Sequence, residues 1–125
     1  DSIVRGTTSL KIVQMMRDAG AAEVHMRIAS PPTEHSCFYG VDTPTRDQLL
    51  AARHDVLAMA ELIGVDSLAF ISLNGMYRAV SGVNRNNLAP QYCDACFSGE
   101  YPIALTDYSA DGPTKKKSLF VKDVA

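Results

Sequence analysis

The feature that most constrains the fold is a Gly-Thr-Thr-Ser turn, residues 6–9, placed directly before a helical pattern. Over residues 9–19 apolar side chains recur at helical spacing, and Gly20 stands where a helix C-terminal cap is expected. Residues 24–28 then alternate apolar and polar side chains, which predicts a β-strand. A loop, a helix and a strand in this order begin a β-α-β unit. We therefore predict an α/β protein with a mainly parallel, Rossmann-like sheet.

Further helices and one more strand are expected in the middle of the chain. Thr45 with Gln48 has the form of a capping box for a helix that runs through residue 52. Asp55 is placed to cap a second helix, and residues 67–71 predict a short apolar strand. Ser72 is placed to cap another helix after that strand.

The pattern changes after residue 82, where Asn, Gly and Pro residues interrupt any long element. We therefore divide the chain into residues 1–82, the α/β part, and residues 83–125, an irregular or helical C-terminal extension that carries two of the cysteines.

Composition is typical of an ordinary globular protein. The 125 residues are 46% hydrophobic and 21% charged, enough for one domain or a large part of one. A net charge of −2 gives no basic surface for nucleic acid, and no apolar run reaches transmembrane length. Three cysteines do not fit the even number of a secreted disulfide framework, which favours a cytoplasmic protein.

The turn before the first helix is a candidate anion site. Gly6 lets the backbone approach a ligand, while Thr7, Thr8 and Ser9 supply hydroxyls beside the unpaired N–H groups of a helix N-terminus. Asp1, across the turn, can hold sugar hydroxyls or a hydrated Mg²⁺. This order of groups suits a ribose 5-phosphate. The alternative is a turn and a helix cap with no ligand.

The cysteines form a second candidate site. Cys93 and Cys96 make a C-x-x-C pair, and Cys37 stands in a separate loop. The pair alone fits a redox couple, half of a zinc site, two ligands of an iron–sulfur cluster, or two buried thiols without a function.

Residues 1–9 resemble the phosphoribosyl diphosphate-binding loop of type I phosphoribosyltransferases. The sequence Ile-Val-Arg-Gly-Thr-Thr-Ser at residues 3–9 resembles the loop of the amidophosphoribosyltransferase family in particular. Ser36 departs from this family, which commonly has Pro there, and the likeness fades after Pro102. Other stretches that resemble the family are residues 23–32, 37–43, 63–68 and 93–97.

This resemblance implies a role for each residue of the loop. Asp1 is expected to face the ribose hydroxyls and Mg²⁺, and Gly6, Thr7, Thr8 and Ser9 to hold the 5-phosphate. Arg5 marks the subfamily and counts among the substrate-binding residues, with its role open. A hydrophobic strand and the first acid of a pair are expected before this loop. Residues 1–82 would then be the C-terminal part of a phosphoribosyltransferase domain.

The resemblance also implies an activity for the parent protein. Amidophosphoribosyltransferases make 5-phosphoribosylamine from phosphoribosyl diphosphate and glutamine-derived ammonia, the first step of de novo purine synthesis. They are oligomers inhibited by purine nucleotides, and their glutaminase domain would lie outside this chain, so these 125 residues alone are expected to be inactive. Two alternatives are another type I phosphoribosyltransferase, which usually lacks the C-x-x-C pair, and a non-catalytic module that binds sugar phosphate or metal.

In the iron–sulfur-bearing members of this family, cysteines at the places of Cys37, Cys93 and Cys96 hold a [4Fe–4S] cluster. The fourth ligand would lie outside this chain. The resemblance therefore implies that the three thiols converge in space.

Overall fold

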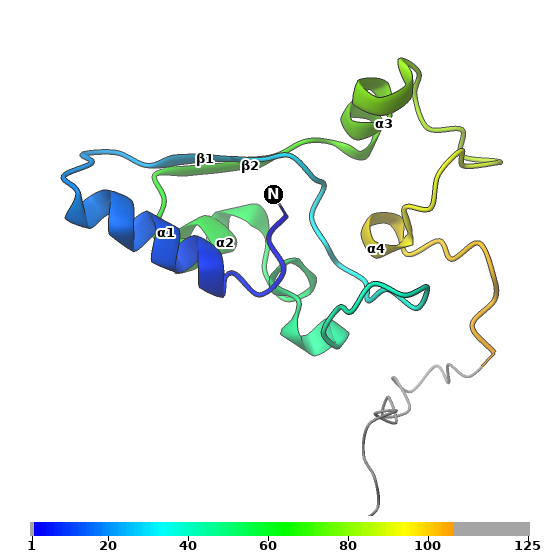
Figure 1. Cartoon of the computed structure of the whole chain (residues 1–125), viewed down its shortest axis with the longest axis horizontal. Helices are drawn as coiled ribbons and strands as arrows, with labels where there is room; N and C mark the ends of the chain where they lie inside the picture. The colour runs from blue at the N-terminus through cyan, green and yellow to red at the C-terminus, as the bar shows by residue number, and fades with distance from the viewer. Residues whose placement is uncertain (1, 107–125) are drawn as a thin grey trace, which may run out of the picture.

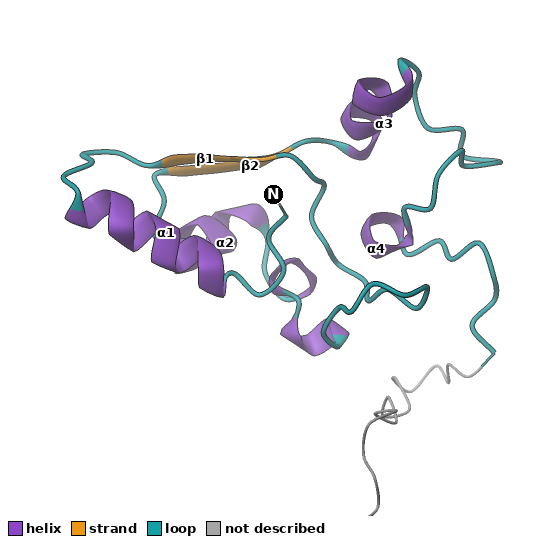
Figure 2. Ribbon diagram, viewed as in Figure 1, coloured by secondary structure: helices purple, strands orange, loops and turns teal. Residues whose placement is uncertain are grey.

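The structure is a computed structural model that describes residues 2–106 (Figure 1). Figure 2 shows α1 and α2 along one side of one small sheet, with α3, α4 and long loops beyond the end of its strands. The elements are α1 (Thr7–Asp18), β1 (His25–Ile28), the 3₁₀ turns η1 (Arg46–Gln48) and η2 (Leu50–Ala52), α2 (Val56–Ile63), β2 (Ser67–Phe70), α3 (Leu73–Ser81) and α4 (Ala95–Ser98).

The two strands pair in parallel, with His25 opposite Ser67 and Ile28 opposite Phe70. Parallel neighbours need a crossover between them, and here α2 supplies it. Both α1 and α2 lie on the same side of the strands (Figure 1). The predicted α/β architecture with a parallel sheet is therefore confirmed.

A small apolar core lies between the sheet and these two helices. Its buried members are Ile3, Val13, Ile28, Ile63 and Val65. Val13 is the one buried residue of α1, whereas Ile63 closes α2 and Ile28 closes β1. Because the segment before α1 contributes Ile3 to this core, the turn that follows it is anchored against α1 and α2.

Two of the predicted helix starts have the expected caps. The Asp55 side chain accepts a hydrogen bond from the Ala58 N–H at 2.8 Å, and Ser72 accepts one from the Gly75 N–H at 3.0 Å. The boundaries of α2 and α3 therefore follow local side-chain chemistry.

The predicted helix from Thr45 through residue 52 is wrong. Two separate 3₁₀ turns occupy this stretch, and the Thr45 side chain makes no cap hydrogen bond. Leu49 between the turns is extended and wholly buried, with 0% of its surface exposed. The Leu50 N–H donates to the Val4 carbonyl at 2.8 Å, so tertiary contacts replace the helical bonds.

The C-terminal extension contains the short helix α4, which lies beside the loop that follows β1 (Figure 1). The last part of the extension, residues 107–125, lies outside the described residues, as does Asp1. Within residues 2–106 no helix has the length and apolar character needed to cross a membrane.

Candidate functional site: a phosphate-type loop and three cysteines

The N-terminus of α1 has no side-chain cap. Gly6 occupies the N-cap position with φ 81° and ψ −8°, and the first helical bond runs from the Leu10 N–H to the Gly6 carbonyl at 2.9 Å. The hydroxyls of Thr7, Thr8 and Ser9 are therefore not used as caps. The N–H groups of the first turn point out of the helix with the positive end of its dipole. This arrangement suits an anion.

Gly6 is required here for two physical reasons. Its positive φ is a conformation that residues with a Cβ adopt at a cost. A Cβ at this position would also lie 2.9 Å from Leu50 Cδ2. The turn is thus pressed against η2, which fixes its position relative to α1.

A cavity of about 630 Å³ opens in front of this turn. Residues 2–9 line it, together with Arg27 of β1 and with Asp42 and Pro44 of the following loop. All predicted loop residues that the structure describes, from Arg5 to Ser9, therefore border one cavity; Asp1 lies outside the described residues. The volume falls within the range of small-molecule sites.

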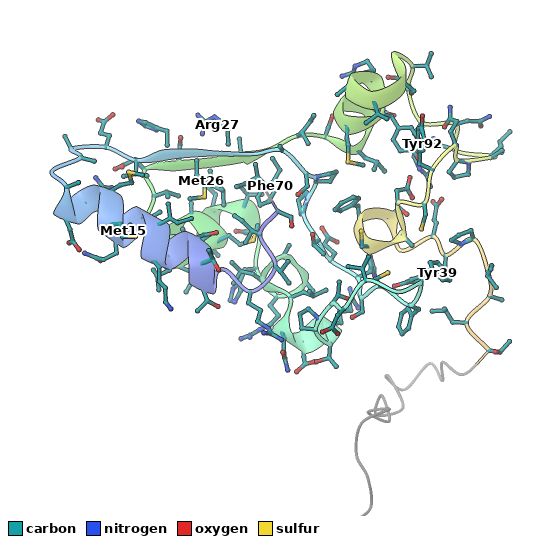
Figure 3. The ribbon with its side chains drawn as sticks, in the orientation of Figure 1. Met15, Met26, Arg27, Tyr39, Phe70 and Tyr92 are labelled. Atoms are coloured by element: carbon teal, nitrogen blue, oxygen red, sulfur yellow. The ribbon has the colours of Figure 1, made fainter. Side chains whose placement is uncertain are left out.

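Sequence reasoning missed the contribution of Arg27, Asp42 and Pro44 to this cavity. Arg27 projects from the open face of the sheet, opposite to Met26 and Phe70, and its Nη1 donates to Ser67 Oγ at 2.9 Å (Figure 3). Asp42 and Pro44 lie in the loop after the carboxyl end of β1, and ligands bind at this end of the strands in open α/β sheets. This general rule could have indicated from the sequence that the loop after β1 borders the site.

The three cysteines are free thiols: Cys93 is exposed, whereas Cys37 and Cys96 are half-buried. Burial raises the pKa of Cys96, and the neighbouring charges of Cys37 and Cys93 raise it further. Among residues 2–106, no group of three or more His, Cys, Asp or Glu side chains is gathered to hold a single metal ion.

The protein itself holds the two cysteine-bearing segments together. The N–H groups of Glu34 and His35 both donate to the Cys96 carbonyl at 3.1 Å. Tyr101 OH donates to the Ser36 carbonyl at 2.6 Å. The Cys37 loop and the C-x-x-C segment are thus joined by hydrogen bonds across more than fifty residues of sequence.

A buried ion pair joins Arg85 to Asp94, which lies between the paired cysteines, and it was not predicted. Asp94 and Arg85 have side chains that are 2% and 4% exposed, and Arg85 Nε donates to Asp94 Oδ2 at 2.6 Å. Burial disfavours the Asp94 carboxylate, but hydrogen bonds from Arg85, Ser98 and Tyr77 outweigh it and lower the pKa. Burial and then the Asp94 hydrogen bond raise the pKa of Tyr77. Asp94 is thus held ionised inside the protein.

Known proteins resemble this chain along almost its whole length. No protein-family model matches it. The amidophosphoribosyltransferase of Rhizobium etli is 56% identical over 124 residues, which is 98% of this chain and 25% of the relative. The amidophosphoribosyltransferase of Bacillus subtilis is 49% identical over 105 residues, 84% of this chain and 22% of the relative.

A solved structure of the same family resembles this chain in three dimensions. Glutamine phosphoribosylpyrophosphate amidotransferase from B. subtilis, complexed with ADP and GMP, superposes with a TM-score of 0.72 at 48% identity. The match covers 81% of this chain and 22% of that one. This chain spans about a quarter of the length of the curated relatives it matches.

The helix–strand unit, its parallel sheet and the loop at the start of α1 define a phosphoribosyltransferase-type domain segment. Within that class, the chain is a homologue of one segment of the amidophosphoribosyltransferases.

Proposed function

We propose that the intact protein carrying this segment is an amidophosphoribosyltransferase, which converts phosphoribosyl diphosphate and glutamine into 5-phosphoribosylamine. The observation that supports this most is the uncapped N-terminus of α1, which opens onto a cavity of about 630 Å³ bordered by residues 2–9. The relatives that match over this same stretch carry the activity in their names. The glutamine-derived ammonia would come from a part of the protein outside this chain.

In this proposal the loop binds the 5-phosphate of the substrate. The left-handed Gly6 brings the backbone close to the phosphate, and the first-turn N–H groups of α1 donate to its oxygens. Thr7, Thr8 and Ser9 add hydroxyl donors from the same turn. Anchoring the 5-phosphate fixes the ribose, so that its anomeric carbon can meet ammonia in the correct orientation.

The displacement of diphosphate builds positive charge on the ribose and negative charge on the leaving group. Residues of this chain contribute by holding the ribose phosphate in place and by closing off one side of the cavity from water. We place Asp1 beside the ribose hydroxyls; Mg²⁺, when bound, would neutralise the diphosphate oxygens. Asp42 is a further carboxylate that borders the cavity.

Substitution of Thr8 tests the phosphate loop. In the intact protein, Thr8→Val should raise the KM for phosphoribosyl diphosphate by about 10- to 100-fold, because one hydrogen bond to a charged group contributes about 1.5–3 kcal/mol. Thr45→Val is the matched control, since Thr45 caps no helix and does not line the cavity. An unchanged KM and kcat in Thr8→Val would refute the assignment.

We also propose that Cys37, Cys93 and Cys96 hold a [4Fe–4S] cluster, with a fourth ligand from outside this chain. The donor set supports this, because three free thiols suit soft metals and hydrogen bonds hold the two cysteine-bearing segments together. Cys37, Cys93 and Cys96 would each supply one thiolate ligand to the cluster. When bound, the cluster would act as a crosslink between the Cys37 loop and the C-terminal extension.

The iron content of the intact protein tests this second proposal. Anaerobic purification should give a brown protein with about four irons per chain, and Cys37→Ser should remove both colour and iron. Isolation of a colourless, iron-free protein under strictly anaerobic conditions would contradict it.

We further propose that purine nucleotides inhibit the intact enzyme and that it is a homo-oligomer. The B. subtilis neighbour is described in complex with ADP and GMP.

A further inference from the structure

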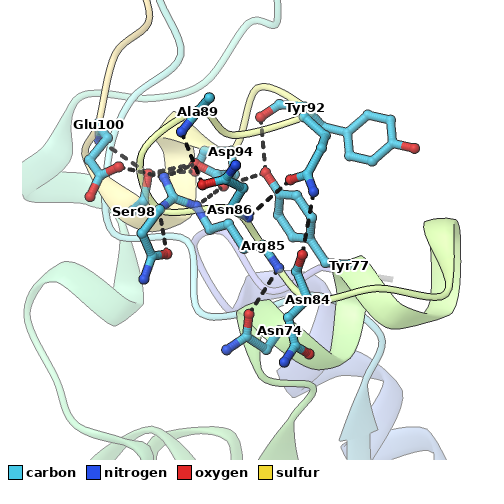
Figure 4. Close-up of polar contacts among 12 residues, drawn as sticks. Asn74, Tyr77, Asn84, Arg85, Asn86, Ala89, Tyr92, Asp94, Ser98 and Glu100 are labelled. Atoms are coloured by element: carbon cyan, nitrogen blue, oxygen red, sulfur yellow. Dashed lines mark hydrogen bonds and ion pairs between the residues drawn. The ribbon is translucent and has the colours of Figure 1, made fainter.

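Asp94, the residue directly after Cys93, has a carboxylate that is buried away from water. Asp94 Oδ2 accepts hydrogen bonds from Arg85 Nε at 2.6 Å and from Tyr77 OH at 2.7 Å. Asp94 Oδ1 accepts from Ser98 Oγ at 2.7 Å, with Arg85 Nη2 at 3.3 Å (Figure 4). A buried carboxylate is tolerated only when its charge and lone pairs are satisfied, and here both oxygens are.

Arg85 connects this carboxylate to the rest of the fold. Its side chain also forms an ion pair with Glu100 and donates through Nη1 to Asn87 Oδ1 at 3.0 Å. Its backbone N–H donates to the side chain of Asn74 in α3 at 3.1 Å. The network in Figure 4 therefore ties α3 to the segment that bears the two thiols.

Asp94 stands at the N-cap of α4 but its side chain does not cap that helix. An Asp at this position ordinarily accepts a bond from the first-turn N–H groups. Here only the Asp94 backbone carbonyl does so, accepting from the N–H groups of Phe97 at 2.8 Å and Ser98 at 2.9 Å. A four-residue helix is not stable on its own, so the Asp94 side chain and its partners set where α4 begins.

We propose that Arg85 and Asp94 are positioning residues for Cys93 and Cys96. Their ion pair fixes the backbone between the two cysteines and aims both thiols toward Cys37 before a metal binds. This positioning role depends on the cluster proposal in one respect only, which is that the metal bound by the cysteines is iron. Neither residue touches reacting atoms, because the carboxylate and guanidinium are occupied by each other and by protein partners.

The first test uses the intact protein in its iron-free form. We expect iodoacetamide to alkylate Cys96 about tenfold faster in Arg85→Gln and Asp94→Asn, since loss of one partner leaves an uncompensated buried charge. Arg85→Lys, which keeps the charge, should recover part of the protection. Arg53→Gln is the matched control, because Arg53 is exposed and makes one long bond of 3.4 Å to the Asp47 carbonyl.

The second test is cluster reconstitution with limiting iron and sulfide. Groups that orient metal ligands typically contribute 10- to 100-fold to metal affinity, so iron retention should fall by a factor in this range in both variants. The Arg85→Gln/Asp94→Asn double variant should lose no more than either single variant, because the two residues act as one unit. The shape of the electron paramagnetic resonance signal of the reduced cluster should change in Arg85→Lys.

The outcomes separate this inference from the cluster proposal. If the wild type binds no iron but both variants still expose Cys96, the cluster is wrong and the positioning role stands. If alkylation and iron retention match those of Arg53→Gln, the positioning role is refuted. Amide exchange distinguishes local from global loosening: faster exchange across α1 and α2, with no rescue by Arg85→Lys, would also refute it.

Discussion

The Gly6→Ala substitution tests whether the loop at the start of α1 has the described conformation. An alanine Cβ at this position meets two obstacles. The backbone is left-handed, with φ 81°, and Leu50 Cδ2 lies 2.9 Å from the added atom. Both obstacles act on the turn that borders the cavity, so stability and substrate binding should change together.

The expected cost follows from these two contacts. A residue with a Cβ in the left-handed region costs about 1–2 kcal/mol, and displacing the Leu50 side chain from its rotamer costs about 1 kcal/mol. The reduced freedom of the unfolded alanine chain returns about 0.4–1 kcal/mol. The free energy of unfolding should therefore fall by about 2 kcal/mol.

Gly20→Ala is the matched control for this prediction. Gly20 has φ 93° and no atom within 4 Å of the added Cβ, so it should lose only the backbone part, about 1 kcal/mol. Urea unfolding of the intact protein measures both losses, and the KM for phosphoribosyl diphosphate should rise in Gly6→Ala alone. Equal losses and equal KM values in the two variants would refute the contact with Leu50 and the role of the turn.

Two further predictions concern the core and a surface ion pair. Leu49→Ala, at a wholly buried position, should lower the free energy of unfolding by about 2–5 kcal/mol, whereas Leu57→Ala, 78% exposed on α2, should change it by less than about 0.5 kcal/mol in urea titrations. The pKa of Asp66 is lowered from 3.8 by the Val24 N–H and then by Arg17, so its stabilisation is present above pH 3.8 and is lost as pH falls through the lowered value. The urea midpoint of Asp66→Asn should therefore lie below that of the wild type at neutral pH, and the gap should close in acid; a constant gap would contradict the linkage.

Local chemistry was sufficient to predict most of the regular elements. The caps at Asp55 and Ser72 act within three residues of the chain, so a sequence pattern reveals them directly. The alternation in β1 is equally local. The loop from Arg5 to Ser9 was predicted by its order of residues, and the structure brings these residues to one cavity.

Long-range contacts decided the parts that the sequence did not reveal. The segment after Thr45 fails to form a helix because Leu49 is buried and Leu50 bonds to Val4, forty-six residues earlier in the chain. The Arg85–Asp94 pair was also hidden, because charged residues nine apart in a loop-rich segment are usually solvated. In both cases the deciding partner lies outside any local window.

The loop after β1 joins the two candidate sites into one structural unit. The Cys37 N–H donates to Thr43 Oγ1 at 2.6 Å, and Ser36 Oγ donates to the Pro44 carbonyl at 2.8 Å, so the loop closes on itself. One side of the closed loop carries a cysteine, and the other side borders the cavity through Asp42 and Pro44. Because both closing bonds are partly buried and short, a shift of this loop at its cysteine would also move the wall of the cavity.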